Sequence, residues 1–250
     1  MFRCIVVSAF VTFCSVGCVA QRPEDKPTPP LNNADQPAQT NKRVRSLGSA
    51  DTRISIVRLN EPRRVRQLYE QAMKAWMRQN PAEAQRKLVE ALKLYPKSPE
   101  ALTFYGGIQG SLQQWESAEQ NLEAAIHCDP SYSPAYVVLA GVYNAQARFD
   151  DAQEATQQAL SAGADSWSVQ YEIARALIGK QQFESALAVT EAALRSKHGS
   201  LLHLAKAHAL LGLRRYPQAA TELRAFVHDQ PDGEGSEQAR NLLNQVQGAP

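Results

Sequence analysis

The sequence has little cysteine, few aromatic residues and almost no net charge. Aromatic residues make up 7% of its 250 residues, and 27 basic against 25 acidic residues leave a formal charge of +2. This balance argues against specific nucleic-acid binding, because nucleic-acid-binding domains are usually markedly basic. With 44% hydrophobic residues and a mean hydropathy of −0.40, the composition also excludes a chain that lies largely within a membrane and a fully disordered chain.

Short motifs for catalysis and metal binding are missing as well. The sequence has no His-Glu-x-x-His pair and no phosphate-binding loop, which are the patterns of zinc hydrolases and of nucleotide-binding enzymes. His203 and His208 are five residues apart, so on a helix they face different sides and do not share a metal ion. We therefore expect no enzymatic activity, no cofactor and no metal site.

The first 20 residues have the layout of an export signal. Arg3 supplies the positive charge, residues 4–13 carry no charge, and small residues follow up to Ala20. This is typical of a signal peptide that is removed on secretion. Two main processing routes are open: cleavage after Ala20, which leaves Gln21 first, or lipid attachment to Cys18 in the lipobox-like stretch 15–18. An uncleaved membrane anchor is a minor third option. The two main routes predict an exported protein in the periplasm or cell envelope, or otherwise secreted.

Either route leaves the chain without an intrachain disulfide. Cys4 and Cys14 are removed with the signal, so the mature protein keeps Cys128 alone or Cys128 with a lipidated Cys18. Stability must then come from packing, even in an oxidising compartment.

A Pro-rich linker is predicted at residues 21–52, followed by a short extended lead-in at 53–64. Five prolines lie between residues 23 and 37 among Asn, Asp and Gln, a composition that cannot bury a core. Residues 42–66 hold eight basic and two acidic residues, which gives +6, whereas the 16 basic and 20 acidic residues from 67 onward give −4. The basic segment 42–66 is either a solvated linker or a patch that touches anionic lipid or an acidic partner.

Small residues recur every 34 positions through the rest of the chain. One register consists of Ala84, Ala118, Ala152 and Ala186, a second of Ala91, Ala125, Ala159 and Ala193, and a third of Ala72, Gly106, Ala140 and Ala174. Small side chains at fixed positions let two antiparallel helices approach closely, and apolar residues recur between them at helical spacing. One helix pair cannot bury its own apolar face, so the pattern predicts a stack of pairs.

This pattern resembles the tetratricopeptide-repeat (TPR) family, here of a bacterial exported type. The resemblance covers units at residues 65–98, 99–132, 133–166, 167–199 and 200–233. It implies an all-α fold over residues 65–247: a right-handed α-solenoid of about five helix pairs, closed by a capping helix at 234–247. Thr156 and Thr190 stand where the family has a large apolar residue, and Phe226 stands where it has Ala.

The resemblance also implies a function and a set of candidate residues. In this family the first helices of successive pairs line a concave face on which peptides usually bind. Matching positions give the candidate groove residues Arg66, Tyr69, Met73, Trp76, Thr103, Asn144, Tyr171, Arg175 and His208. For each of them, packing against the neighbouring unit is the competing interpretation.

We therefore expect a non-catalytic scaffold that binds a protein or peptide in the bacterial cell envelope or outside the cell. The alternative is a structural subunit of an envelope assembly, such as an outer-membrane or pilus complex. Contact with a membrane is expected only through a lipid on Cys18 or through weak contact of segment 42–66, and no nucleic-acid partner is expected.

Overall fold

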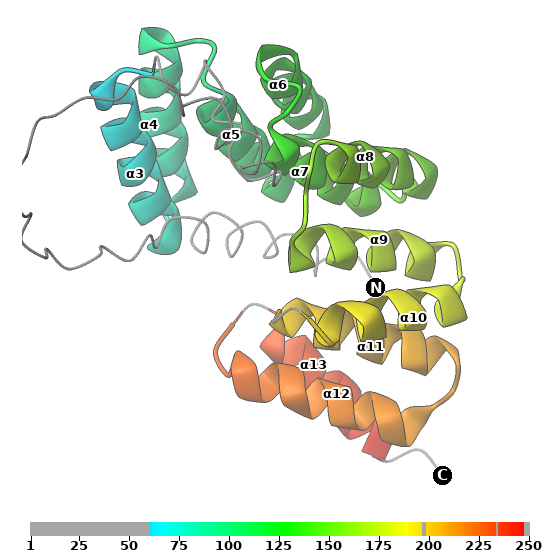
Figure 1. The fold of residues 1–250 in the computed structure, drawn as a ribbon. Helices are drawn as coiled ribbons and strands as arrows, with labels where there is room; N and C mark the ends of the chain where they lie inside the picture. The colour runs from blue at the N-terminus through cyan, green and yellow to red at the C-terminus, as the bar shows by residue number, and fades with distance from the viewer. Residues whose placement is uncertain (1–60, 197–198, 234, 248–250) are drawn as a thin grey trace, which may run out of the picture.

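The structure is a computed structural model that describes residues 61–196, 199–233 and 235–247. Every regular element in these ranges is an α-helix (Figure 1). The helices are α3 (Arg63–Met77), α4 (Pro81–Leu94), α5 (Pro99–Ser111), α6 (Trp115–Cys128), α7 (Ser133–Ala145), α8 (Phe149–Ser161), α9 (Trp167–Gly179), α10 (Phe183–Leu194), α11 (Ser200–Gly212), α12 (Tyr216–Asp229) and α13 (Ser236–Gln247). They form five successive helix pairs and a final single helix, which confirms the predicted all-helical solenoid. The predicted signal peptide, Cys18, the linker and most of the lead-in lie outside the described residues.

Local sequence signals explain where several helices begin. The Asn80 side chain accepts a hydrogen bond from the Glu83 backbone N–H at 3.1 Å, and Pro81 follows as the first residue of α4. Ser98 caps α5 in the same way through the Ala101 N–H at 3.2 Å. Such caps satisfy N–H groups that have no partner inside the helix. Because Pro62 precedes α3 and has a fixed backbone, that helix begins at Arg63, two residues before the predicted unit boundary.

The turn between the two helices of a pair is the same in all five pairs. One residue in each turn adopts a left-handed backbone with φ of 58° to 60°: Gln79, Gln113, Ala147, Gln181 and Arg214. In the first pair the Gln79 N–H donates to the Trp76 carbonyl at 2.8 Å, and the Asn80 N–H donates to the Ala75 carbonyl at 3.0 Å. These two bonds close the end of α3 as a Schellman motif. The sequence analysis did not anticipate these turns because none of the five residues is glycine.

The small residues of the three registers lie at the helix contacts. Ala84, Ala118, Ala152 and Ala186 are all fully buried, as are Ala72, Ala140 and Ala174. A Cβ atom added at Gly106 would lie 2.8 Å from the Leu122 side chain and 3.0 Å from the Ala118 carbonyl oxygen. The helices of the second pair therefore pack at a separation that only a very small residue allows. The departures at Thr156 and Thr190 do not disturb the core, because each hydroxyl donates to a carbonyl of its own helix.

Aromatic residues at the start of the second helices join neighbouring pairs. A Cβ atom on Gly179, the last residue of α9, would lie 2.2 Å from the Phe149 ring at the start of α8. Gly212 and Phe183 repeat this contact one unit later, with 2.4 Å. Each ring thus lies against a backbone that carries no side chain at that point, and this contact fixes the spacing of adjacent pairs.

The stack curves toward the first helices of the pairs. Helices α5 and α7, α7 and α9, and α9 and α11 pack closely, whereas the second helices α6, α8 and α10 do not do so with one another in the described ranges. A stack whose first helices lie closer together than its second helices bends toward the first ones. Helices α5, α7, α9 and α11 therefore line the inner face of the array, together with α3 at its N-terminal end. No helix within the described residues has the length and apolar character needed to span a membrane.

Candidate functional site

The inner face brings together only part of the predicted groove. The candidates come from α3, α5, α7, α9 and α11 in turn, so they spread along the whole array. They separate into an aromatic group on α3, the isolated Thr103 on α5, and a connected polar group on the last three of these helices. Arg66, on α3, is exposed and belongs to none of these groups.

At the N-terminal end the aromatic candidates surround Phe104. The Tyr69 ring meets the Phe104 ring edge-on with centroids 5.6 Å apart, and the Trp76 ring does so at 6.5 Å. Met73 packs into the same cluster, and Phe104 itself is 6% exposed. Edge-to-face pairs of this kind add stability beyond the area they bury. These half-buried side chains therefore hold the first pair against the second, and they offer a ligand only their outer edges.

Asn144, Arg175 and Glu172 form one polar network across two helices. The Asn144 Nδ2 group donates to the Glu172 carboxylate and to the Glu172 backbone carbonyl, both at 2.9 Å. One Glu172 oxygen also accepts from the Arg175 guanidinium at 2.7 Å. Asn144 is 7% exposed and Glu172 is 5% exposed, so the ion pair is largely shielded from water. A charge at this depth needs such partners, because an unpaired buried carboxylate is very costly.

Tyr171 and His208 complete this group, which we call the inner polar cluster (Asn144, Tyr171, Glu172, Arg175 and His208). The Arg175 guanidinium lies 5.6 Å from the centroid of the Tyr171 ring, within the range of a cation–π contact. Burial raises the pKa of Tyr171 to about 12, with Arg175 opposing and Glu172 adding to the rise. Burial, and then the positive charge of Arg175, lowers the pKa of His208 to about 4. Near neutral pH the cluster therefore holds a neutral phenol, a neutral imidazole and one balanced ion pair.

Buried polar atoms without hydrogen-bond partners mark this face as a candidate binding site. Among the described residues, the Asn144 Oδ1, His208 Nε2 and Thr103 Oγ1 atoms are buried and make no hydrogen bond. Each such atom costs about 1–3 kcal/mol, and natural proteins retain few of them. Two of the three belong to the inner polar cluster. A ligand that offered a donor to Asn144 and a polar atom to His208 would recover this cost.

Glu172, the centre of the cluster, was not among the candidate residues predicted from the sequence. The available signal was a lone acidic residue among apolar neighbours in residues 167–179, three residues before Arg175. At that spacing two side chains meet on one helix face.

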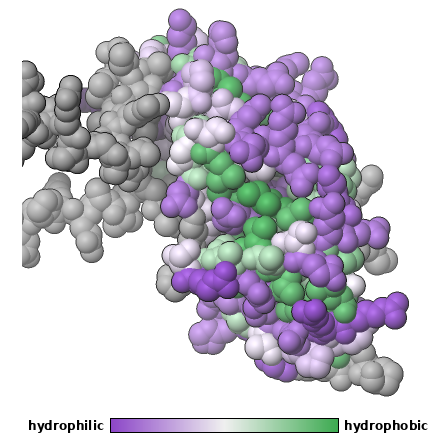
Figure 2. Space-filling model, turned by 45° about the vertical axis from the view of Figure 1, so that its right-hand side comes forward, coloured by the Kyte–Doolittle hydropathy of each residue, from purple (hydrophilic) through white to green (hydrophobic). Residues whose placement is uncertain are grey.

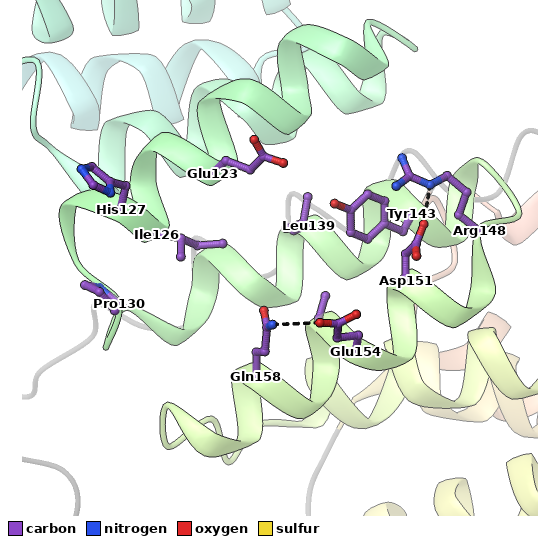
Figure 3. Close-up of a pocket in the computed structure, with 11 residues that line it drawn as sticks. Glu123, Ile126, His127, Pro130, Leu139, Tyr143, Arg148, Asp151, Glu154 and Gln158 are labelled. Atoms are coloured by element: carbon purple, nitrogen blue, oxygen red, sulfur yellow. Dashed lines mark hydrogen bonds and ion pairs between the residues drawn. The ribbon is translucent and has the colours of Figure 1, made fainter.

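A second concavity, lined by α6, α7 and α8, was not predicted from the sequence. A pocket of about 510 Å³ opens between α6 and α8 (Figure 3). We call it the outer pocket and define it by Glu123 and Ile126 of α6, Leu139 and Tyr143 of α7, and Ala155 and Glu154 of α8.

Figure 2 shows a face of the molecule on which hydrophobic residues gather in a band between hydrophilic ones. Apolar surface of this kind is common where proteins bind other molecules.

The remaining chemistry-bearing side chains have local roles. The described residues contain no group of three His, Cys, Asp or Glu side chains that could hold a metal ion. His203 pairs with Glu222 at 2.6 Å, and Lys206 pairs with the same carboxylate at 2.8 Å. Burial raises the pKa of the Cys128 thiol, with Lys97 opposing, so the reactive thiolate is disfavoured.

Comparison with known proteins identifies the repeat. Family models described as tetratricopeptide repeat match residues 69–133 and 111–170. A search of curated proteins found no match. Among solved structures, a thermophilic TPR protein of Thermus thermophilus is 18% identical, with a TM-score of 0.66 over 73% of this chain and 98% of that chain. A TPR protein of Parabacteroides merdae is 17% identical, with a TM-score of 0.64 over 74% and 71%.

A third similar structure is that of pilF from Pseudomonas aeruginosa. It is 16% identical, with a TM-score of 0.58 over 73% of this chain and 88% of that chain. At these identities the likeness to all three structures concerns the fold alone.

Proposed function

We propose that this chain, which belongs to the tetratricopeptide-repeat family, binds a peptide segment of a partner protein on its inner face. TPR proteins are scaffolds for protein–protein interaction and are in general not catalytic. The proposal adds where on this scaffold the ligand lies. Its central contact point is the inner polar cluster, with the edges of Tyr69, Met73 and Trp76 available toward the N-terminal end.

The observation that carries the proposal is the pair of unpaired atoms within the cluster. The Asn144 Oδ1 atom needs a donor, and the His208 Nε2 atom needs a polar partner. An extended peptide carries N–H and C=O groups along its backbone and can supply both. Because Glu172 already neutralises Arg175, the cluster has no spare positive charge for a terminal carboxylate. A neutral stretch of main chain therefore fits it better than a chain end.

Selection from a random-peptide phage library on the full chain tests the proposal. We expect the selected peptides to bind with affinities that fall at least tenfold when Asn144→Ala or His208→Gln is introduced. The matched control is Glu237→Gln, an exposed glutamate on α13, which should leave binding unchanged. Thermal melts of each variant identify any loss of folding. The proposal fails if no peptide is selected, or if the affinities ignore both substitutions in proteins that remain folded.

The cellular location is part of the same proposal. Arg3, the uncharged run at 4–13 and the small residues up to Ala20 support export, which puts the inner face in the periplasm, in the cell envelope or outside the cell. Mass spectrometry of the mature protein from a bacterial host tests this. An acylated Cys18 means a tethered scaffold, and an N-terminal Gln21 means a soluble exported one. A mature chain that still begins at Met1 contradicts both processing routes.

A second candidate function is a structural subunit of an envelope assembly. The fold similarity to pilF is compatible with it but does not favour it over peptide binding, since the likeness extends to TPR proteins in general. Size-exclusion chromatography of membrane extracts distinguishes the two, because a subunit elutes with a large stable complex whereas a transient binder elutes alone.

A further inference from the structure

One residue that lines the outer pocket is smaller than its equivalents in the other units. Ala155 occupies a position of the second helix that is three residues after the repeat alanine. The equivalent residues are Lys87, Asn121, Val189 and Glu222. Asn121 hydrogen-bonds to Gln109 at 2.8 Å, the partly buried Val189 packs against the core, and Glu222 binds His203. Asn121 and Glu222 thus bond to the first helix of their own pair, and Val189 packs against apolar clusters of the neighbouring helices. Ala155 instead lines the pocket of about 510 Å³.

The floor of the pocket is apolar and its two rims carry carboxylates. Ile126, Leu139 and Ala155 line the interior. Glu123 lies on the α6 rim and Glu154 on the α8 rim, as Figure 3 shows. No other pair of units has an acidic residue at both of these repeat positions: the residues that match Glu123 are Val89, Gln157 and Glu191, and those that match Glu154 are Gln120, Ala188 and Thr221. The pocket therefore has an apolar floor and a negatively charged side chain on each side of its opening.

These carboxylates are available to a ligand. Glu123 and Glu154 are exposed, and Glu154 accepts only a long 3.4 Å bond from Gln158. The third rim carboxylate, Asp151, is already paired with Arg148 at 2.6 Å, and Arg148 also stacks 4.2 Å from the Tyr143 ring centroid. Arg148, the cation at the rim, therefore already contacts Asp151 and Tyr143. Among the described residues, neither Glu123 nor Glu154 forms an ion pair.

We propose that the outer pocket binds an arginine or lysine side chain presented by a segment of a partner protein. The apolar stem of such a side chain covers Leu139 and Ala155, and its cationic head lies between Glu123 and Glu154. Arginine suits an acidic rim best, because its guanidinium offers five N–H donors to carboxylate oxygens. The raised pKa of Tyr143, caused by burial and then by Glu119, with Arg148 opposing and Glu123 and Asp151 adding, agrees with a negative potential at this spot.

This site is separate from the inner face. At 3.6 residues per turn, Leu139 lies about 140° and Tyr143 about 100° around α7 from Asn144. A partner could therefore occupy the outer pocket while a peptide lies on the inner face. If the proposal for one site is wrong, the proposal for the other still stands. The Asn144→Ala variant, which changes the inner polar cluster, distinguishes the two.

Nuclear magnetic resonance titration of the full chain with blocked tripeptides tests the proposal. The probe is Ac-Leu-Arg-Leu-NH2, and the matched probes carry Gln or Glu in place of Arg; the blocked ends remove terminal charges. We expect amide shifts at Leu139, Ala155 and Gln158 with the Arg probe. The association constant should fall about two- to fivefold for the Gln probe and further for the Glu probe. Raising the salt concentration should weaken binding of the Arg probe, because the rim is exposed.

Three variants locate the contact. Glu123→Gln and Glu154→Gln should each lower the association constant of the Arg probe about two- to fivefold. Ala155→Val, which introduces the residue found at position 189, should weaken the shifts by narrowing the apolar floor of the pocket. Asn144→Ala should leave them unchanged. Both Gln substitutions are on the surface and should not affect folding, so they test the site even if Ala155→Val proves unstable.

Four results would overturn the proposal. One is equal binding of the Arg and Gln probes, and another is binding that ignores Glu123→Gln and Glu154→Gln. The third is that pocket shifts appear only after Arg53 and Arg58 are both replaced by Gln, which would mean that this chain's own basic segment is the occupant. The fourth is that the pocket signals move with protein concentration alone, which would mean that a second copy occupies the pocket.

Discussion

The five left-handed turn residues make a quantitative prediction about stability. Gln79, Gln113, Ala147, Gln181 and Arg214 adopt φ of 58° to 60°, a conformation that costs a residue with a Cβ atom about 1–2 kcal/mol. All five are exposed, and their side chains make no hydrogen bond or ion pair in the described structure. Glycine would remove the steric cost and lose no contact.

The gain at each turn is reduced by the greater freedom of glycine in the unfolded chain. That term is about 0.4–1 kcal/mol, so we expect each substitution to stabilise the fold by roughly 0.5–1 kcal/mol. Because the turns lie in separate units, their effects should add. All five together should contribute about 2.5–5 kcal/mol, which corresponds to a rise in Tm of roughly 5–20 °C for a domain of this size.

A pair of identical substitutions gives the sharpest form of this test. Gln113→Gly changes a left-handed turn, whereas Gln157→Gly changes an exposed position inside α8. The first should raise the free energy of unfolding in urea, and the second should lower it by about 1 kcal/mol, because glycine is a poor helix residue. If both variants lose stability, the turn residues are not strained and the reasoning is wrong.

Three further predictions concern the inner polar cluster and the junctions between units. The folded pKa of His208, about 4, lies below its ordinary value of 6.5, so the unfolded chain binds a proton first; stability is complete above pH 6.5 and falls as the pH drops toward 4. Urea titrations should show this loss in the natural chain and not in His208→Gln, and identical pH profiles would refute it. Arg175→Leu leaves the Glu172 carboxylate buried without its cation and should cost about 3–5 kcal/mol, and adding Glu172→Gln should restore most of that loss in a double-mutant cycle. Gly179→Ala forces a Cβ atom against the Phe149 ring and should lower the free energy of unfolding by about 1–3 kcal/mol; an unchanged Tm would contradict the close contact.

The fold could be predicted from the sequence because the 34-residue repeat consists of small residues at fixed positions, and these indicate close contacts between helices. An alanine or glycine every 34 residues specifies a close helix contact, and Ala84, Ala118, Ala152 and Ala186 are indeed fully buried. The turns were less visible, because Gln79 and its equivalents are not the glycines that such a backbone favours. The hydrogen bonds of the Schellman motif hold the chain there against its local preference.

The candidate site was predictable only position by position. Repeat places assign Asn144, Tyr171, Arg175 and His208 to the inner face, but they do not say whether these side chains meet. That depends on Glu172, whose carboxylate accepts from both Asn144 and Arg175. A buried carboxylate is set by the partners that surround it in three dimensions, and these partners are 28 and three residues away in the sequence. A family pattern of small and large residues carries no such information.

The position occupied by Ala155 shows how a regular array acquires individual sites. The family pattern leaves this position free, and the chain uses it differently in each unit: Asn121 supports a neighbouring helix through a hydrogen bond, Val189 fills the core, and Glu222 anchors an ion-pair network. Helix packing tolerates all of these because the flanking alanines keep the backbones in place. The same freedom lets a small residue, Ala155, line a pocket without weakening the stack. Binding properties of this protein should therefore vary most strongly with residues that the repeat does not constrain, and substitutions between Ala155 and its equivalents should move or close pockets while the solenoid stays intact.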